Sequence, residues 1–333
     1  MTDSRAASRF RIAAIALAVL ALCAVPYVIT EVYYVNIASQ ILLYAIFALG
    51  LNVLVGYAGL VSLGHAGLFG VAAYVVAYLL AAGHGHAVAI AAAVVAALAT
   101  TAGFAALSLR ATGISFIMIT LALGEIIWGL AYRWISLTNG DNGISVAARP
   151  APFGLALSSA AAFYDATLIV FLAAIAAVAV FVRSPLGAAL RGTRDQPRRM
   201  NALGYHVWMI RFWAFMFSGL LTAVAGILFV YYTEFISPQA LALTASAEGL
   251  LMVISGGAGT LLGPVVGAAL VVIVKNVVSG YVERWNFMLG AIFVAIVVFM
   301  PEGLVPGAVR LARSAWRGIG RRKPAAGIAE PQR

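Results

Sequence analysis

The sequence predicts an all-α polytopic membrane protein with about ten transmembrane helices, and three observations support this prediction. Of the 333 residues, 64% are hydrophobic and only 10% are charged, with a mean hydropathy of +1.02. A soluble domain usually carries about 25% charged residues, so this chain has too few polar side chains to cover its apolar surface in water. The apolar residues also form long runs, and the basic residues collect outside those runs.

Ten apolar runs have the composition of membrane helices. A bilayer core about 30 Å thick needs roughly 20 apolar residues per helix. The runs lie near 12–30, 36–56, 66–82, 87–109, 113–132, 164–182, 207–231, 244–256, 261–279 and 286–304. The eighth run is short, and the glycine-rich stretch 256–260 separates it from the ninth. We therefore expect eight to ten transmembrane helices, some of them broken at glycine-rich motifs.

The first run comes after three arginines within residues 1–11 and so resembles a secretory signal peptide. Its apolar part, from Ile12 to Ile29, is long for such a peptide, and Leu22 is too large to precede a lipoprotein cleavage site at Cys23. We expect an uncleaved first helix behind a short cytoplasmic N-terminus. Cys23 is the only cysteine, so no internal disulfide can form.

Lysine and arginine divide unevenly between the two sides of the predicted helices. With the N-terminus inside, the cytoplasmic segments hold Arg5, Arg9, Arg11, Arg110, Arg183, Arg191, Arg194, Arg198, Arg199, Arg211, Arg310, Arg313, Arg317, Arg321, Arg322, Lys323 and Arg333. The outer segments hold only Arg133, Arg149 and Arg284, and Lys275 lies within a helix. This bias predicts an even number of helices with both termini cytoplasmic. The net charge of +10 then belongs to juxtamembrane segments, and no nucleic-acid partner is expected.

The same pattern divides the chain into regions. We expect residues 1–11 to form a cytoplasmic N-terminus, 12–305 a transmembrane domain, and 306–333 a basic cytoplasmic tail. Within the domain, an external loop is expected near 133–163 and an arginine-rich cytoplasmic loop near 183–206. That second loop is either a solvated positive-inside segment or a docking element for a cytoplasmic partner.

A glycine-rich motif lies at the end of the second run, from Gly50 to Gly67. Closely spaced glycines let helices approach each other and let a helix break, and a break at membrane depth needs protein or a water-lined cavity around it. The motif therefore indicates either tight helix packing or a substrate path. A similar pattern ends the eighth run, and a true internal repeat would place broken helices at corresponding positions. The candidate path comprises Asn52, Gly56, Gly59, Ser62, His65, Thr120, Glu125, Gly256, Gly257 and Gly259.

Three charged residues lie in or beside apolar runs. Glu125 stands in the middle of the fifth run, where a carboxylate is costly and indicates a functional role. Lys275 lies near the outer end of its run, so we expect it to reach the interface by snorkelling. Glu248 either lies outside the membrane or caps the N-terminus of the eighth helix.

Enzyme motifs are absent from the sequence. It contains no G-x-x-x-x-G-K-[ST] phosphate loop, so the chain is not expected to hydrolyse ATP by itself. No CxxC or HExxH occurs, and His84 and His86 lack a third ligand, so no metal site is predicted.

Four ordered motifs together resemble the branched-chain amino-acid ABC transporter permease family, in its second membrane-subunit type. They cover roughly residues 35–305 and comprise 50–74, Thr138-Asn139-Gly140-Asp141-Asn142-Gly143-Ile144, the cytoplasmic stretch from Ser184 to Gly204, and the stretch from Glu248 to Pro264. The chain departs from the family pattern at Asn139, where glycine is usual, and at Asn201, where an acidic residue is common. Pro197 also interrupts the polar run of the loop.

The resemblance implies a permease subunit in the bacterial inner membrane that imports branched-chain or other small amino acids. Its partners would be two ABC ATPase subunits, a homologous second permease and a periplasmic binding protein. The chain itself would hold no cofactor, because ATP and magnesium would bind to the ATPases. The family's coupling loop falls on Arg191, Arg194, Asp195, Arg198, Arg199, Ala202, Leu203 and Gly204, which are the predicted ATPase-docking residues.

Three alternatives remain open on the sequence. The same fold in close relatives carries urea or short amides. A secondary transporter driven by an ion gradient would use Glu125 as its coupling carboxylate. A membrane assembly protein would have no role in uptake.

Overall fold

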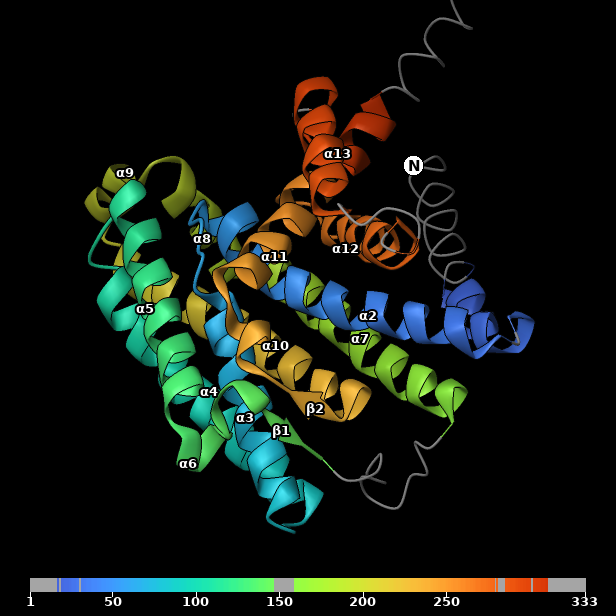
Figure 1. The fold of residues 1–333 in the computed structure, drawn as a ribbon. Coiled ribbons are helices and arrows are strands. Elements are labelled where there is room, and N and C mark those ends of the chain that lie inside the picture. The colour runs from blue at the N-terminus through green and yellow to red at the C-terminus, as the bar shows by residue number, and fades with distance from the viewer. Residues whose placement is uncertain are drawn as a thin grey trace, which may run out of the picture.

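The computed structural model describes residues 17, 19–29, 31–146, 159–278, 280, 285–300 and 302–310 (Figure 1). Its long helices are α2 (Val32–Asn52), α3 (His65–Ala81), α4 (His86–Ser108), α5 (Ile114–Arg133), α7 (Ala160–Arg183), α10 (Val207–Thr233), α11 (Leu243–Gly256), α12 (Gly263–Ile273) and α13 (Trp285–Phe299). Shorter elements are η1 (Val53–Ala58), α6 (Ile135–Thr138), η2 (Gly140–Asn142), β1 (Ile144–Ser145), α8 (Pro185–Asp195), α9 (Pro197–Ala202), β2 (Phe235–Ile236), η4 (Pro238–Leu241) and η5 (Val274–Val278). The predicted N-terminus 1–11, the middle of the external loop and most of the tail 306–333 lie outside the described residues.

The predicted apolar runs coincide with helices. Each run from 36–56 onward matches a described helix whose ends lie within a few residues of the prediction. Five described helices are long and apolar enough to cross a membrane, namely Val32–Ala58, α4, α5, α7 and α10. Shorter apolar helices lie at Val19–Val28, α3, α11 and Gly263–Val277. The all-α, polytopic architecture is confirmed, whereas the count of ten and the side of each terminus stay predictions.

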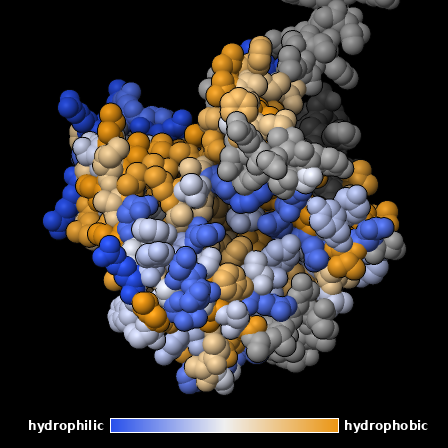
Figure 2. All heavy atoms as spheres, in the orientation of Figure 1, coloured by the Kyte–Doolittle hydropathy of each residue, from blue (hydrophilic) through white to orange (hydrophobic). Residues whose placement is uncertain are grey.

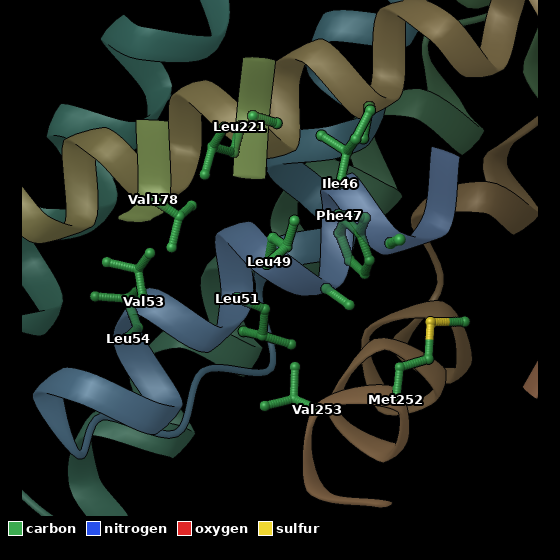
Figure 3. Packing of buried hydrophobic residues seen from close by; sticks show 14 of the residues in the cluster. Ile46, Phe47, Leu49, Leu51, Val53, Leu54, Val178, Leu221, Met252 and Val253 are labelled. Carbon is green, nitrogen blue, oxygen red and sulfur yellow. The ribbon is translucent and has the colours of Figure 1, made fainter. Parts of the chain in front are cut away.

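Helix α2 lies at the centre of the bundle. In the most apolar part of Val32–Ala58, 83% of the residues are buried. The corresponding values are 22% in α5 and 28% in α4. Figure 3 shows side chains of α2 and η1 facing Val178 of α7, Leu221 of α10 and Val253 of α11. From Leu42 to Asn52 every residue of α2 except Tyr44 is buried, so this half is a core helix, whereas α4 and α5 leave wide apolar faces exposed.

Beside the buried hydrophobic residues around α2, a second hydrophobic cluster joins α3, α4 and α10. Ala89, Ala93 and Ala97 recur every fourth residue on α4, so they form one fully buried face. Small residues bring the backbones close: a Cβ on Gly226 of α10 would collide with the backbone of Phe69. In lipid, where apolar burial drives helix association weakly, such close packing supplies much of the attraction.

Both glycine-rich motifs break helices, as the sequence predicted. Helix α2 passes into the π-helical turn η1 and stops at Gly59, whose φ of 69° is left-handed. Helix α11 stops at Gly256, and Gly257 and Gly259 come next with φ of 118° and 79°. Left-handed backbone favours glycine because a Cβ would meet the neighbouring carbonyl.

The bundle has two distinct ends (Figure 1). One end carries α8 and α9, and Figure 2 shows hydrophilic residues gathered at the corner that α9 forms. The other end carries a small antiparallel pair, in which Ile144 of β1 faces Ile236 of β2. This pair was not predicted from the sequence, because two-residue strands leave no periodic pattern.

Candidate functional site

The two glycine-rich breaks meet in space, and we call this meeting point the glycine junction (Asn52, Gly56, Gly59 and 256–263). The Asn52 side chain donates from Nδ2 to the Thr260 carbonyl at 2.9 Å and accepts from the Gly259 N–H at 2.9 Å. Asn52 is fully buried, so both ends of its amide are satisfied by one partner segment. The sequence echo between the two motifs thus corresponds to a contact between two helix breaks.

Backbones approach so closely at the junction that side chains do not fit. A Cβ on Gly56 would collide with the backbone nitrogen of Gly259, and a Cβ on Gly256 would collide with the carbonyl of Gly263. Gly56 and Gly256 are therefore required by close contact, whereas Gly59, Gly257 and Gly259 are favoured by their left-handed backbone.

Arg194 connects the junction to the end that carries α8. Its Nη1 donates to the Gly56 carbonyl, and its side chain passes over Gly59. The same nitrogen lies 3.7 Å from the position of a Cβ on Gly259. One arginine of α8 therefore donates to the first helix break and lies near the second. A carbonyl freed at a helix break is a natural acceptor for a guanidinium group.

Ser62 and His65 belong to a different, fully buried cluster. His65 lies 2.9 Å from Ser62 Oγ through Nδ1 and 2.9 Å from Ser218 Oγ through Nε2. Because the Ser218 hydroxyl donates to the Gly50 carbonyl at 2.6 Å, Nε2 is the nitrogen that donates to Ser218. The cluster ties the start of α3 to α2 and α10 with all its partners satisfied.

Thr120 and Glu125 lie on α5. The buried Thr120 hydroxyl accepts from the Leu63 N–H at 3.3 Å and donates to the Ile117 carbonyl at 2.9 Å. Glu125 is half-buried, and no hydrogen bond or ion pair of its carboxylate is found within the described residues. Neither residue lines the cavity described next.

A cavity of about 350 Å³ opens between α2, α3, α10 and α11, and we call it the aromatic cavity. Its lining comprises Tyr44, Phe47, Ala66, Phe69, Phe229, Thr233, Phe235, Ser237, Gln239, Ala240, Thr244, Ala245, Glu248 and Lys275. In Figure 2 the surface between α11 and β2 is hollowed, with apolar residues at the bottom and hydrophilic ones around it. None of the predicted path residues is among those that line this cavity.

Glu248 and Lys275 form an ion pair in this cavity, which corrects the expectation for Lys275 and excludes one of the two interpretations of Glu248. Lys275 Nζ lies 3.2 Å from Oε1 and 3.0 Å from Oε2 of Glu248. Lys275 therefore turns toward another helix instead of snorkelling. Glu248 is the sixth residue of α11, so it does not cap that helix. The two residues are 27 positions apart with a helix break between them, so no sequence pattern predicted that they would pair.

The predicted docking residues lie at the other end, on α8, α9 and the turn after α9. Ser184 caps α8 by accepting from the Gly187 N–H at 3.2 Å, and Pro185 begins the helix. Arg191, Arg194 and Asp195 lie on its exposed face, and no residue of α9 is buried. Arg198, Arg199, Ala202, Leu203 and Gly204 are all exposed. The predicted docking residues thus share one accessible surface.

This surface is fixed to the bundle at two points. Leu190 of α8 is fully buried, and Arg211 of α10 donates to the carbonyl of Thr193 on α8 at 2.7 Å. Beside α9, a groove of about 480 Å³ is lined by Leu109, Asn201, His206, Val207, Trp208, Met209 and Arg211. An exposed helix pair that is anchored to the bundle and has a neighbouring groove is suited to binding a partner protein.

Comparison with known proteins gives one family and several relatives. The family described as branched-chain amino acid transport system, permease component, matches residues 33–297. The high-affinity branched-chain amino acid transport system permease protein LivM of Escherichia coli K12 is 31% identical over 82% of this chain and 70% of its own length. LivM of Salmonella typhimurium is 30% identical over the same shares.

Two further relatives differ in how much of the chain they cover. The permease protein LivH of Escherichia coli K12 is 23% identical over 79% of this chain and 91% of its own length. The autoinducer 2 import system permease protein LsrC of Yersinia enterocolitica is 30% identical over only 39% of this chain and 39% of its own length. No solved structure matches the chain. The chain is a transporter permease subunit and not an enzyme: it belongs to the family of branched-chain amino acid transport system permease components.

Proposed function

We propose that this chain is a membrane-spanning permease subunit of an ABC importer that moves branched-chain or other small amino acids into the cytoplasm. The match to LivM carries this proposal, because LivM is named as the permease of such a transport system. LivM and LivH are both permease proteins of one kind of system, which supports a homologous second permease as a partner. Two ATPase subunits that bind ATP and magnesium, and a periplasmic binding protein, complete the proposed assembly.

The proposed topology has ten membrane helices in the bacterial inner membrane, with both termini in the cytoplasm. In that topology α8 and α9 face the cytoplasm, and the β1–β2 pair faces the periplasm. The exposed arginines of α8 and α9 then stand where an ATPase can reach them. ATP binding in the partners would move α8, and Arg194 would pass that motion to the glycine junction.

Docking is tested by a pull-down of the detergent-solubilised chain from its native membrane. We expect the wild-type chain to bring down two ATPases and a second permease, and an Arg198/Arg199→Glu variant to lose the ATPases. Arg110→Glu is the control, because Arg110 is an exposed arginine outside α8 and α9. Wild-type chain that comes down alone yet supports uptake after reconstitution would refute the ABC assignment.

Uptake by the reconstituted assembly separates the remaining alternatives. A gradient-driven carrier that uses Glu125 would lose all uptake in Glu125→Gln, whereas an ATP-driven importer keeps it. A urea or amide permease would take up labelled urea and leave labelled leucine outside. We expect leucine uptake that depends on ATP and survives Glu125→Gln.

A further inference from the structure

The aromatic cavity contains both a positive and a negative charge within an otherwise neutral lining. Side-chain exposure is 20% for Glu248 and 36% for Lys275, so the pair is partly withdrawn from water but reachable from the cavity. Ion pairs in such surroundings stabilise a fold poorly, because desolvation offsets much of the attraction between the charges. Ionisable residues inside membrane bundles are costly and mark sites of function. The pair therefore calls for an explanation other than stability.

Aromatic rings form the apolar wall beside this pair. The rings of Phe47 and Phe69 meet edge to face with centroids 5.5 Å apart, and those of Phe69 and Phe229 do so at 5.3 Å. Phe47 also packs against α11 at Gly249, the residue after Glu248. Three helices thus contribute one continuous aromatic surface that begins next to the carboxylate.

The cavity has the size and the polar groups of a small-molecule site. Such sites usually range from roughly 300 to 1,000 Å³ and are mostly apolar with a few placed polar groups. At about 350 Å³ the aromatic cavity lies at the small end of that range. Besides the ion pair, it offers the hydroxyls of Thr233, Ser237 and Thr244 and the amide of Gln239.

We propose that the aromatic cavity is a transit site that recognises the zwitterionic backbone of an amino acid, with Glu248 binding the ammonium and Lys275 the carboxylate. The substrate side chain then lies against Phe47, Phe69 and Phe229. This inference rests on the proposed function. It adds that the permease subunit itself recognises the amino-acid zwitterion. The glycine junction, which the sequence suggested as part of the path, lies apart from this site.

The charge pattern explains which ligands the site accepts. A zwitterion replaces one ion pair by two, so every charge keeps a partner. An amine would offer Lys275 no carboxylate to bind, and a carboxylic acid would offer Glu248 no ammonium. Each analogue makes only one of the two charge-assisted contacts, so both bind more weakly than the zwitterion.

The test is leucine uptake by the complete reconstituted transporter, with the binding protein saturated so that delivery is equal in every variant. We expect Glu248→Gln and Lys275→Met each to lower uptake about tenfold or more, as the loss of a charge-assisted contact does. The exchanged pair, Glu248→Lys with Lys275→Glu, keeps an ion pair but reverses its direction. We expect this double variant to assemble as the wild type does but not to recover leucine uptake. Glu302→Gln serves as control, because Glu302 pairs with Arg310 outside the cavity at 3.5 Å.

Wild-type uptake by the exchanged pair, or by both single variants, would overturn the transit site and leave the ion pair a structural role. Failure of the wild-type assembly to import leucine would instead count against the proposed function alone.

A second measurement covers variants that fail to assemble. Thr244 lines the cavity and is exposed, so Thr244→Cys in a Cys23→Ser background places one alkylatable thiol there. We expect leucine to slow its alkylation, and 4-methylpentanoate and isoamylamine to have no effect. Equal alkylation with and without leucine would refute the site.

Discussion

Asn52 joins two helix breaks through a single side chain, and its removal has a calculable cost. Asn52→Ala leaves the Gly259 N–H and the Thr260 carbonyl without their 2.9 Å partners. An unpaired backbone group withdrawn from water costs about 1–3 kcal/mol, so we expect the two groups together to lower the unfolding free energy by about 2–6 kcal/mol. Reversible denaturation in detergent measures it. Ser39→Ala is the control, because within the described residues the buried Ser39 hydroxyl donates to the Val35 carbonyl of its own helix.

Asn139 shows why a family position that prefers glycine can hold asparagine. Its φ of 60° is left-handed, and its side chain donates to the Gly143 carbonyl at 3.0 Å. Asparagine tolerates this conformation because its short amide bonds to nearby backbone. We expect Asn139→Gly to melt close to wild type. Asn139→Ala should lose about 1–2 kcal/mol of stability, and equal melting of both variants would contradict this account.

At the scale of elements, the helix pair α8 and α9 both presents an exposed surface and contacts the glycine junction, and the two roles are separable. Arg198 and Arg199 are exposed on α9, whereas Arg194 contacts the Gly56 carbonyl. We expect Arg194→Gln to keep the ATPases bound in a pull-down but to reduce leucine uptake severalfold, because the link to the glycine junction is lost. ATPase rate and uptake, measured together, report this uncoupling. Parallel loss of ATPase binding and uptake would place Arg194 in the docking surface alone.

The elements that the sequence predicted are those with a local cause. Apolar runs specify helices, and glycine clusters specify their breaks, because hydropathy and backbone freedom belong to adjacent residues. The ion pair of Glu248 and Lys275 joins two helices, and Asn52 contacts residues 207 and 208 positions away. The π-helical turns η1 and η5 also left no sequence signal. The path residues could therefore be named as polar or glycine-rich, but not divided between the junction and the buried cluster, and the cavity, which none of them lines, was not predicted.

For the whole molecule, the unequal burial of the helices indicates where partners bind. The most apolar part of Val32–Ala58 is 83% buried, whereas less than a third of the most apolar part of α4 or α5 is buried. Lipid covers such faces without cost, and so does a second permease. Burial within one chain therefore separates the helices that hold the subunit together from those available to its surroundings.

The predicted sidedness of the molecule follows from its arginines and is tested by thiol labelling in intact cells. In a Cys23→Ser background, His84→Cys and Gln239→Cys lie near the end of the bundle that carries β1 and β2, and Gly204→Cys lies beyond α9. We expect an impermeant maleimide to label the first two in intact cells and Gly204→Cys only after permeabilisation, because the 17 arginines and lysines assigned to one side hold that side in the cytoplasm. Labelling of Gly204→Cys from outside would reverse the orientation and move α8 and α9 to the periplasm. The ATPases would then have no access to the arginines of this surface, so the proposed direction of coupling depends on this result.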